Sequence, residues 1–175
     1  MKEKIEKIIE IPEGVDVKAD GKVVVKGPRG EIERKFSYPN INLEVSGNKI
    51  LIFAEKCTKR EKKIIMTTAA HINNMISGVQ EKFKYKLQVC SVHFPITVKI
   101  EGNFLKVKNF FGETKERKAL ILPGVNAEIK GDIIEVESVS RESAGQTAAN
   151  IETATKIRSK DRRIFQDGIY IIEKG

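Results

Sequence analysis

An internal repeat is the feature that most constrains how this chain can fold. The segment Thr68–Ile72 (Thr-Ala-Ala-His-Ile) returns 79 residues later as Thr147–Ile151 (Thr-Ala-Ala-Asn-Ile). Two further pairs follow in the same order, at offsets of 84 and 82 residues: Gly47–Ile50 with Gly131–Ile134, and Lys26–Glu31 with Lys108–Glu113. A period this long exceeds that of most solenoid repeats, so it predicts two copies of one small domain.

The composition permits two small domains and indicates their partners. Of the 175 residues 40% are hydrophobic and none is Trp, so Ile, Val and Leu must fill the cores. A formal net charge of +8 favours nucleic acid or another anionic surface as partner. No apolar stretch approaches the roughly 18 residues of a membrane span, and residues 1–10 lack the apolar segment of a signal peptide. We therefore expect a cytoplasmic protein with no membrane partner and with free, structural thiols at Cys57 and Cys90.

Each copy has the pattern of a small antiparallel sheet covered by one helix. After a charged lead-in at residues 1–10, apolar and polar residues alternate about a hairpin turn signal at Asp20-Gly21. Further strands are expected at Ile32–Phe36, Ile41–Val45 and Ile50–Phe53. Thr58 with Glu61 forms a capping-box pattern. It precedes apolar residues spaced as one helical face, namely Ile65, Ala69, Ile72, Ile76 and Val79.

The second copy repeats this order with a different helix face. Ser140 or Ser143 is expected to cap a helix that runs to about Ile157, with its buried face at Ala144, Ala148, Ile151 and Ala154. These side chains are smaller than those of the first helix, so the second helix is expected to lie closer to its sheet. The segment Phe83–Val89 alternates as a strand that either closes the first copy or leads to the second. We expect an α+β protein of two duplicated domains, residues 1–91 and 92–175.

The usual signatures of an enzyme are missing from the sequence. His71 and His93 form no paired metal-ligand motif, and the Gly27–Gly30 turn lacks the Gly-Lys-Ser/Thr ending of a phosphate-binding loop. Most carboxylates alternate with lysines, which is typical of solvated strand faces. We therefore expect neither catalysis nor a metal or other cofactor.

The strongest local signal for binding is a basic segment after the second helix. It contains Lys156, Arg158, Lys160, Arg162 and Arg163, with Asp161 as its one acidic residue. Lys and Arg neutralise phosphates and release counterions. The alternative is an exposed helix end where the helix dipole favours cations.

Aromatic residues and turns provide further candidates. Phe165 and Tyr170 could stack on unpaired bases, although at least one of them is expected to dock in the domain's own core. Phe110 and Phe111 occupy a turn of the second copy; either they insert into RNA or a protein, or one is buried and the other half-exposed. Lys26 and Arg29 flank the matching turn of the first copy, where glycine permits close approach to a phosphate backbone.

Several motifs together resemble the large-subunit ribosomal protein of the L-six family, in its archaeal and eukaryotic form. They are Ile11–Val15, the Lys26–Gly30 turn, Pro123–Val125, Gly145–Ile151 and, most specific, the ending Lys160–Tyr170. The resemblance covers essentially the whole chain. Bacterial members end in a Gly- and Lys-rich segment instead, so bacterial tail contacts are not transferable to this chain.

The resemblance implies two similar α+β domains and binding to large-subunit rRNA near the factor-binding region, close to the sarcin-ricin loop and the stalk base. It implies that the second domain and tail make most rRNA contacts. Arg141 and Gln146 are secondary candidates because they lie at the start of the second helix, where backbone amides can also bind phosphate. Neighbouring large-subunit and stalk-base proteins are expected partners, and contact with translation factors stays open. Two rival hypotheses are an adaptor whose apolar tail docks on a protein, and a hydrolase with an unfamiliar carboxylate site.

Overall fold

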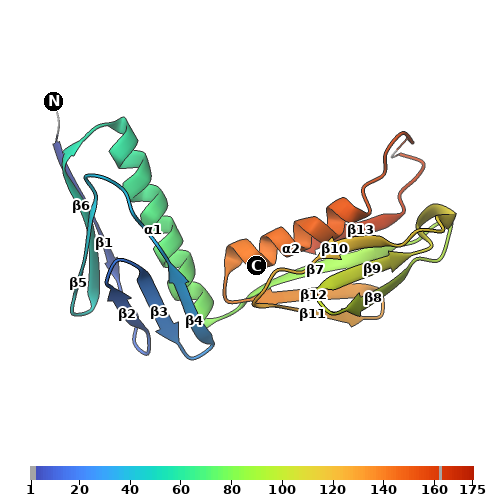
Figure 1. Cartoon of the computed structure of the whole chain (residues 1–175), viewed down its shortest axis with the longest axis horizontal. Coiled ribbons are helices and arrows are strands. Elements are labelled where there is room, and N and C mark those ends of the chain that lie inside the picture. Colours follow the sequence, from blue (N-terminus) through green and yellow to red (C-terminus); the bar gives the residue numbers. More distant parts are fainter. Residues whose placement is uncertain (1–2, 162) are drawn as a thin grey trace. The chain divides into compact units, whose positions relative to one another are not determined.

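The computed structural model describes residues 3–161 and 163–175 and divides into two compact units, Met1–Lys82 and Phe83–Gly175. We call them unit 1 and unit 2 (Figure 1). Each unit combines one long helix with small antiparallel sheets, which confirms the predicted α+β class and the duplication. In each unit the helix packs against two sheets, and not against one as expected.

Unit 1 contains two three-stranded sheets, of order β1-β6-β5 and β2-β3-β4. The bounds of its elements are β1 Glu3–Glu10, β2 Asp16–Ala19, β3 Val23–Gly27, β4 Gly30–Arg34, β5 Asn42–Ser46, β6 Lys49–Cys57 and α1 Lys59–Gln80. The expected turn at Asp20-Gly21 joins β2 to β3, and Gly21 has a φ of +72°, as such turns require.

Helix α1 begins with the predicted capping box. The Thr58 side chain accepts a hydrogen bond from the Arg60 amide, and the Glu61 carboxylate accepts one from the Thr58 amide at 2.8 Å. All five side chains of the predicted apolar face are at most 5% exposed: Ile65, Ala69, Ile72, Ile76 and Val79. The local signals and the burial agree, so this helix is specified largely by its own sequence.

The N-terminal segment is not the charged lead-in that we expected, because it forms β1 and pairs antiparallel with β6. Ile9 is buried while Ile8 is exposed, so the strand contributes one apolar face to the core. The outer face of β1 carries mostly charged residues. These residues hide the alternation of apolar and polar positions that would identify a strand in the sequence.

Unit 2 contains a four-stranded sheet of order β11-β12-β7-β13 and a three-stranded sheet of order β10-β9-β8. The bounds of its elements are β7 Phe83–Cys90, β8 Thr97–Glu101, β9 Phe104–Lys108, β10 Arg117–Leu120, β11 Val125–Lys130, β12 Ile133–Ser138, α2 Arg141–Ala154 and β13 Gly168–Glu173. A 3-10 turn spans Phe110–Gly112. Because β7 pairs with β12 and β13, the units divide after Lys82 and not at the expected boundary between residues 91 and 92.

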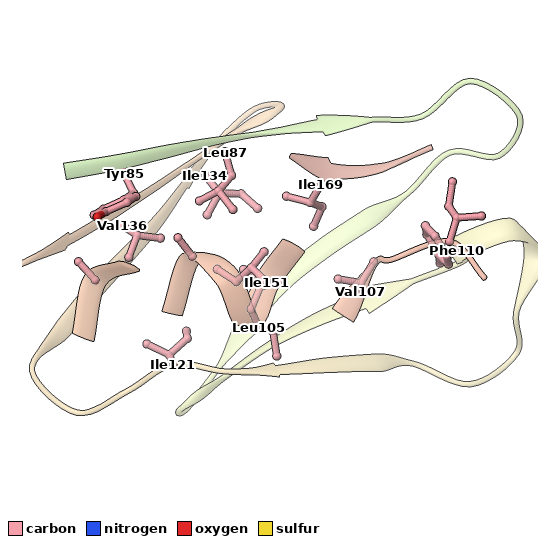
Figure 2. Close-up of a cluster of buried hydrophobic side chains, with 14 residues drawn as sticks. Tyr85, Leu87, Leu105, Val107, Phe110, Ile121, Ile134, Val136, Ile151 and Ile169 are labelled. Atoms are coloured by element: carbon pink, nitrogen blue, oxygen red, sulfur yellow. The ribbon is translucent and has the colours of Figure 1, made fainter. Parts of the chain in front are cut away.

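The core of unit 2 lies between helix α2 and the strands (Figure 2). Leu87 and Ile134 contribute from the large sheet, Leu105 from β9 and Ile151 from α2. Ser140 caps the helix, which ends at Ala154, earlier than expected. A Cβ atom at the α2 glycine, Gly145, would lie 3.2 Å from the Tyr85 hydroxyl oxygen, so helix and sheet approach closely at this point.

The apolar end of the chain docks on its own unit. Strand β13 lies antiparallel beside β7, with Tyr170 opposite Gln88, and Ile169 is buried. The rival adaptor hypothesis required this apolar segment to bind another protein, but here the segment pairs with β7 of its own unit. In the described part of the chain, neither helix is long and apolar enough to cross a membrane.

Candidate nucleic-acid interface

The basic segment after α2 is held on unit 2 by alternate buried residues. Thr155 and Ile157 are buried, and the Thr155 hydroxyl accepts a hydrogen bond from the Ile169 amide at 2.9 Å. Lys156, which lies between these two residues, and Arg158, which follows them, are exposed. The fold therefore anchors the segment while turning these two cations toward solvent.

An open pocket of about 370 Å³ brings the basic segment together with strand β10. It is lined by Arg117, Lys118, Thr153, Ala154, Lys156 and Arg158. Within the described residues, Lys118, Lys156 and Arg158 form no ion pair or hydrogen bond with a carboxylate. Three cations of this kind around one pocket can bind phosphate oxygens, and we call this site the basic pocket.

Arg117 has a structural role in the basic pocket. Its guanidinium donates to both Glu113 carboxylate oxygens, at 2.8 and 2.5 Å, and to the Ala154 carbonyl oxygen at 3.0 Å. It also lies 4.2 Å from the centre of the Phe110 ring. The guanidinium lowers the pKa of the Glu113 carboxyl. Arg117 thus fastens the 110–113 turn to the end of α2, and three of its five N–H donors are already used.

A second cluster, the aromatic tip, consists of His93, Phe111, Lys160 and Phe165. The Phe165 ring centre lies 5.1 Å from that of His93 and 5.8 Å from that of Phe111. The Lys160 ammonium lies 5.0 Å from the Phe111 ring centre and 4.6 Å from the Phe165 ring centre. Two cation–π contacts therefore position this exposed charge without neutralising it.

Backbone strain accompanies the aromatic tip. Among the described non-glycine residues of unit 2, Asn109, Phe111 and Ser159 have positive φ angles, of 58°, 50° and 60°. A left-handed conformation is costly for a side chain as large as Phe. Strain of this kind persists only where the surrounding structure enforces it, and it is commonest at functional sites.

Asp167 fastens the loop before β8 to the tail. Its carboxylate accepts hydrogen bonds from the Val92 and His93 amides, at 2.7 and 2.9 Å, and contacts the His93 ring at 2.6 Å. Burial alone would raise the pKa of this carboxyl, but the hydrogen bonds outweigh burial and lower its pKa to about 2. The ionised carboxylate is therefore part of the scaffold that holds the aromatic tip.

The remaining tail cations differ in availability. Arg163 is highly exposed, but its guanidinium pairs with Asp161 at 2.9 and 3.2 Å. This pairing lowers the pKa of the Asp161 carboxyl. Arg162 lies outside the described residues. Lys156, Arg158 and Lys160 are thus the described tail cations that no carboxylate neutralises.

The predicted aromatic contacts separate into surface and core. Phe110 is 1% exposed and belongs to the core, as Figure 2 shows, so its ring does not reach a ligand. Phe111 is half-buried in the aromatic tip. Tyr170 is half-buried and lines a smaller pocket beside Lys156 and Ile157.

Other sequence-predicted residues lie away from these clusters. Arg141 and Gln146 belong to the first half of α2, whereas the basic pocket lies at the end of that helix. Gln146 donates to the Asn150 side chain at 2.9 Å. Lys26 and Arg29 belong to unit 1, where Lys26 pairs with Glu31 at 3.0 Å and the Arg29 amide donates to Val79.

Sequence reasoning missed Lys118. The residue stands in a mixed run, Lys115-Glu116-Arg117-Lys118, in which charges of both signs suggest an ordinary solvated strand. Its proximity to Lys156 and Arg158 depends on the packing of β10 against α2. Only the alternation within β10, with Ala119 buried and Lys118 exposed, indicated that this lysine faces outward.

Comparisons with known proteins agree with this organisation. The profile of ribosomal protein L6 matches residues 11–82 and 94–168, one segment for each copy. A large ribosomal subunit protein uL6 of Methanosarcina mazei is 46% identical over 99% of both chains. Proteins of the same name from Methanobrevibacter smithii and Aeropyrum pernix are 44% and 46% identical over 95% of this chain and 94% and 92% of theirs.

These matches span both units and include the specific ending of the chain, which confirms the resemblance inferred from the motifs. The family consists of structural proteins and not of enzymes. With a profile match over most of its length and relatives that are 44% to 46% identical, this chain belongs to the ribosomal protein L6 family.

Proposed function

We propose that this protein is a structural constituent of the large ribosomal subunit in the cytoplasm and binds large-subunit rRNA mainly through unit 2. The basic pocket is the observation that carries this proposal, because three of its cations form no ion pair with a carboxylate among the described residues. A rigid surface of this kind suits folded RNA, which proteins recognise through its backbone and shape.

Within this proposal the residues have distinct roles. Lys118, Lys156 and Arg158 contact phosphates, and Lys160 presents a charge fixed by two aromatic rings. Arg163 contributes after exchanging Asp161 for a phosphate, and Arg162 is a further phosphate contact. Phe111 offers a half-exposed ring for stacking, whereas Phe110 supports it from the core. Arg141, Gln146, Tyr170, Lys26 and Arg29 are peripheral contacts.

The rRNA target that we propose is the factor-binding region, near the sarcin-ricin loop and the stalk base. The family resemblance supports this placement. Neighbouring large-subunit and stalk-base proteins are the protein partners in this proposal. Crosslinking from Lys160 and Phe111 inside assembled large subunits tests it, and crosslinks to distant rRNA would overturn the placement.

The salt dependence of rRNA affinity tests the basic pocket directly. Replacing Lys118, Lys156 and Arg158 by Ala is expected to lower the slope of log affinity against log salt by about 2 to 3, since each phosphate contact contributes roughly 0.7 to 0.9. The matched control replaces Lys59, Lys62 and Lys63 of α1, three exposed cations of unit 1, and is expected to retain most of the slope. Equal losses in both variants would contradict the assignment to unit 2.

A further inference from the structure

Strands β1 and β7 occupy equivalent places in the two units but have different neighbours. The Ile11 amide donates to Asn48 at 2.9 Å just beyond β1, and the Val89 amide donates to Asp132 at 2.8 Å in β7. Both acceptors lie in the turn before the partner strand, β6 or β12. On its other side β7 pairs with β13, whereas β1 is the edge of its sheet among the described strands (Figure 1).

The free edge of β1 presents backbone groups ready for pairing. In an antiparallel pair, residues alternate between those bonded to the partner strand and those whose amide and carbonyl point away. With Ile11 bonded to Asn48, the register of β1 and β6 makes Ile9 and Lys7 face β6. The amides and carbonyls of Glu6, Ile8 and Glu10 therefore point to the free edge.

The sheet face beside this edge carries three apolar residues among charged ones in unit 1, whereas in unit 2 it carries cross-strand charge pairs. Ile8, which is 51% exposed, lies opposite Leu51 of β6, and the neighbouring Phe53 is half-buried on the same face. We call these three residues the apolar strip. The equivalent pair in unit 2 is Lys86 opposite Glu135. That face carries ion pairs, such as Lys84 with Glu137 at 3.1 Å.

We infer that the β1 edge of unit 1 binds an extended segment of another protein as an added antiparallel strand, in the place that β13 occupies in unit 2. Main-chain hydrogen bonds to Glu6, Ile8 and Glu10 supply the pairing, and the apolar strip accepts a large apolar side chain from the added strand. Lys4 pairs with Glu6 at 3.3 Å, so Glu10 is the carboxylate beside this edge that has no partner among the described residues, and it favours a basic side chain in the added strand. The Glu10 carboxylate also repels phosphate, which disfavours RNA at this end of the edge.

The inference rests on the proposed function in one respect, because its test compares the free protein with the protein assembled into the large ribosomal subunit. Hydrogen–deuterium exchange of the peptide spanning residues 4–10 is measured in the free full-length protein and in assembled subunits. We expect at least tenfold slower exchange of the outward-pointing amides after assembly. Equal exchange in both states would overturn the inference.

A paired variant removes the docking surface without removing the fold. Ile8→Lys with Leu51→Glu gives unit 1 the residue pair that unit 2 has at these positions, on the sheet face opposite the buried Ile9. The protection of residues 4–10 is expected to disappear in this variant, and retained protection would contradict the strand site. An unchanged salt slope of rRNA binding shows that unit 2 is intact, so a loss of protection then bears on the strand partner alone.

Two substitutions at Ile8 distinguish the contribution of backbone pairing from that of the side-chain contact. Ile8→Ala keeps the outward amide, whereas Ile8→Pro removes it without breaking a bond to β6. We expect Ile8→Pro to lose more protection at the neighbouring Glu6 and Glu10 amides than Ile8→Ala. A photo-crosslinker at Glu6 is expected to label another protein, and labelling of rRNA or of a second copy of this chain would overturn the inference.

Discussion

The two units share a scaffold and differ at its edges. Both place a helix against two antiparallel sheets, and equivalent turns connect β3 to β4 and β9 to β10. In unit 1 that turn is built from Gly27-Pro28-Arg29-Gly30, whereas in unit 2 it contains the strained Phe111. Unit 2 also has β13 and the basic segment, which have no counterpart among the described elements of unit 1. Duplication therefore supplied the framework, and the surfaces that differ are the ones where distinct binding partners are expected.

The largest expected effect concerns the two cores. Ile72 and Ile151 are equivalent in the repeat and both are fully buried. Replacing either by Ala is expected to cost about 2 to 5 kcal/mol of unfolding free energy, because a cavity remains. Since each unit has its own core, calorimetry should show each substitution lowering the transition of one unit only. A shift of both transitions by either variant would show that the units unfold together.

A smaller effect is expected at the turn that differs between the units. A Cβ atom at Gly27 would lie 2.8 to 2.9 Å from Val79, including its carbonyl oxygen. That carbonyl oxygen also accepts the Arg29 amide, so Gly27→Ala is expected to destabilise unit 1 by about 1 to 3 kcal/mol in denaturant unfolding. The control is Lys26→Ala, a neighbouring substitution that leaves the backbone unchanged. Gly131→Ala is unsuitable as a control because Gly131 has a positive φ, so alanine would strain the backbone there. Equal stability of Gly27→Ala and Lys26→Ala would contradict this packing.

The tail anchor gives a pH-dependent effect confined to unit 2. The pKa of the Asp167 carboxyl is lowered from 3.8 to about 2, so its stabilisation is present above pH 4 and is lost as the pH falls toward 2. Asp167→Asn is expected to cost unit 2 about 1 to 2 kcal/mol at pH 7, after allowance for solvent screening at the half-exposed His93. Unfolding free energies measured from pH 2 to 7 should converge for the two proteins at low pH. A constant difference across this range would indicate a role independent of ionisation.

The smallest expected effect concerns the charged sheet face of unit 2. Lys84 and Glu137 form an exposed cross-strand ion pair. A double-mutant cycle with Gln at both positions is expected to give a coupling below about 1 kcal/mol, and added salt should weaken it. A larger, salt-insensitive coupling would contradict the assignment of this pair to a solvent-screened sheet face.

Local patterns predicted several elements correctly. The helical spacing of Ile65, Ile72 and Val79 identified the buried face of α1, and the capping residue fixed its start. The hairpin at Asp20-Gly21 also follows from short-range chemistry. These features depend on residues a few positions apart, and therefore the sequence carries them directly.

Features that depend on distant pairing were less predictable. Strand β1 was missed because its charged edge hides a single buried face, and β7 was ambiguous because alternation does not reveal which sheet a strand joins. The basic tail was recognised as a cluster, but Lys118 joins it only through the packing of β10 on α2. The sequence left open whether one of Phe110 and Phe111 is buried and which one, and the turn geometry decided that Phe110 is buried and Phe111 half-exposed.

The sequence by itself determined the duplication, the α+β class, the helix faces and the family. Each of these is encoded by repeated spacing or by short motifs. Only the tertiary structure decided that β13 fills the edge of β7 while the β1 edge stays open, and that three cations from two segments surround one pocket. The physical reason is that main-chain pairing and charge proximity depend on which elements pack together, and spacing along the chain does not specify that choice.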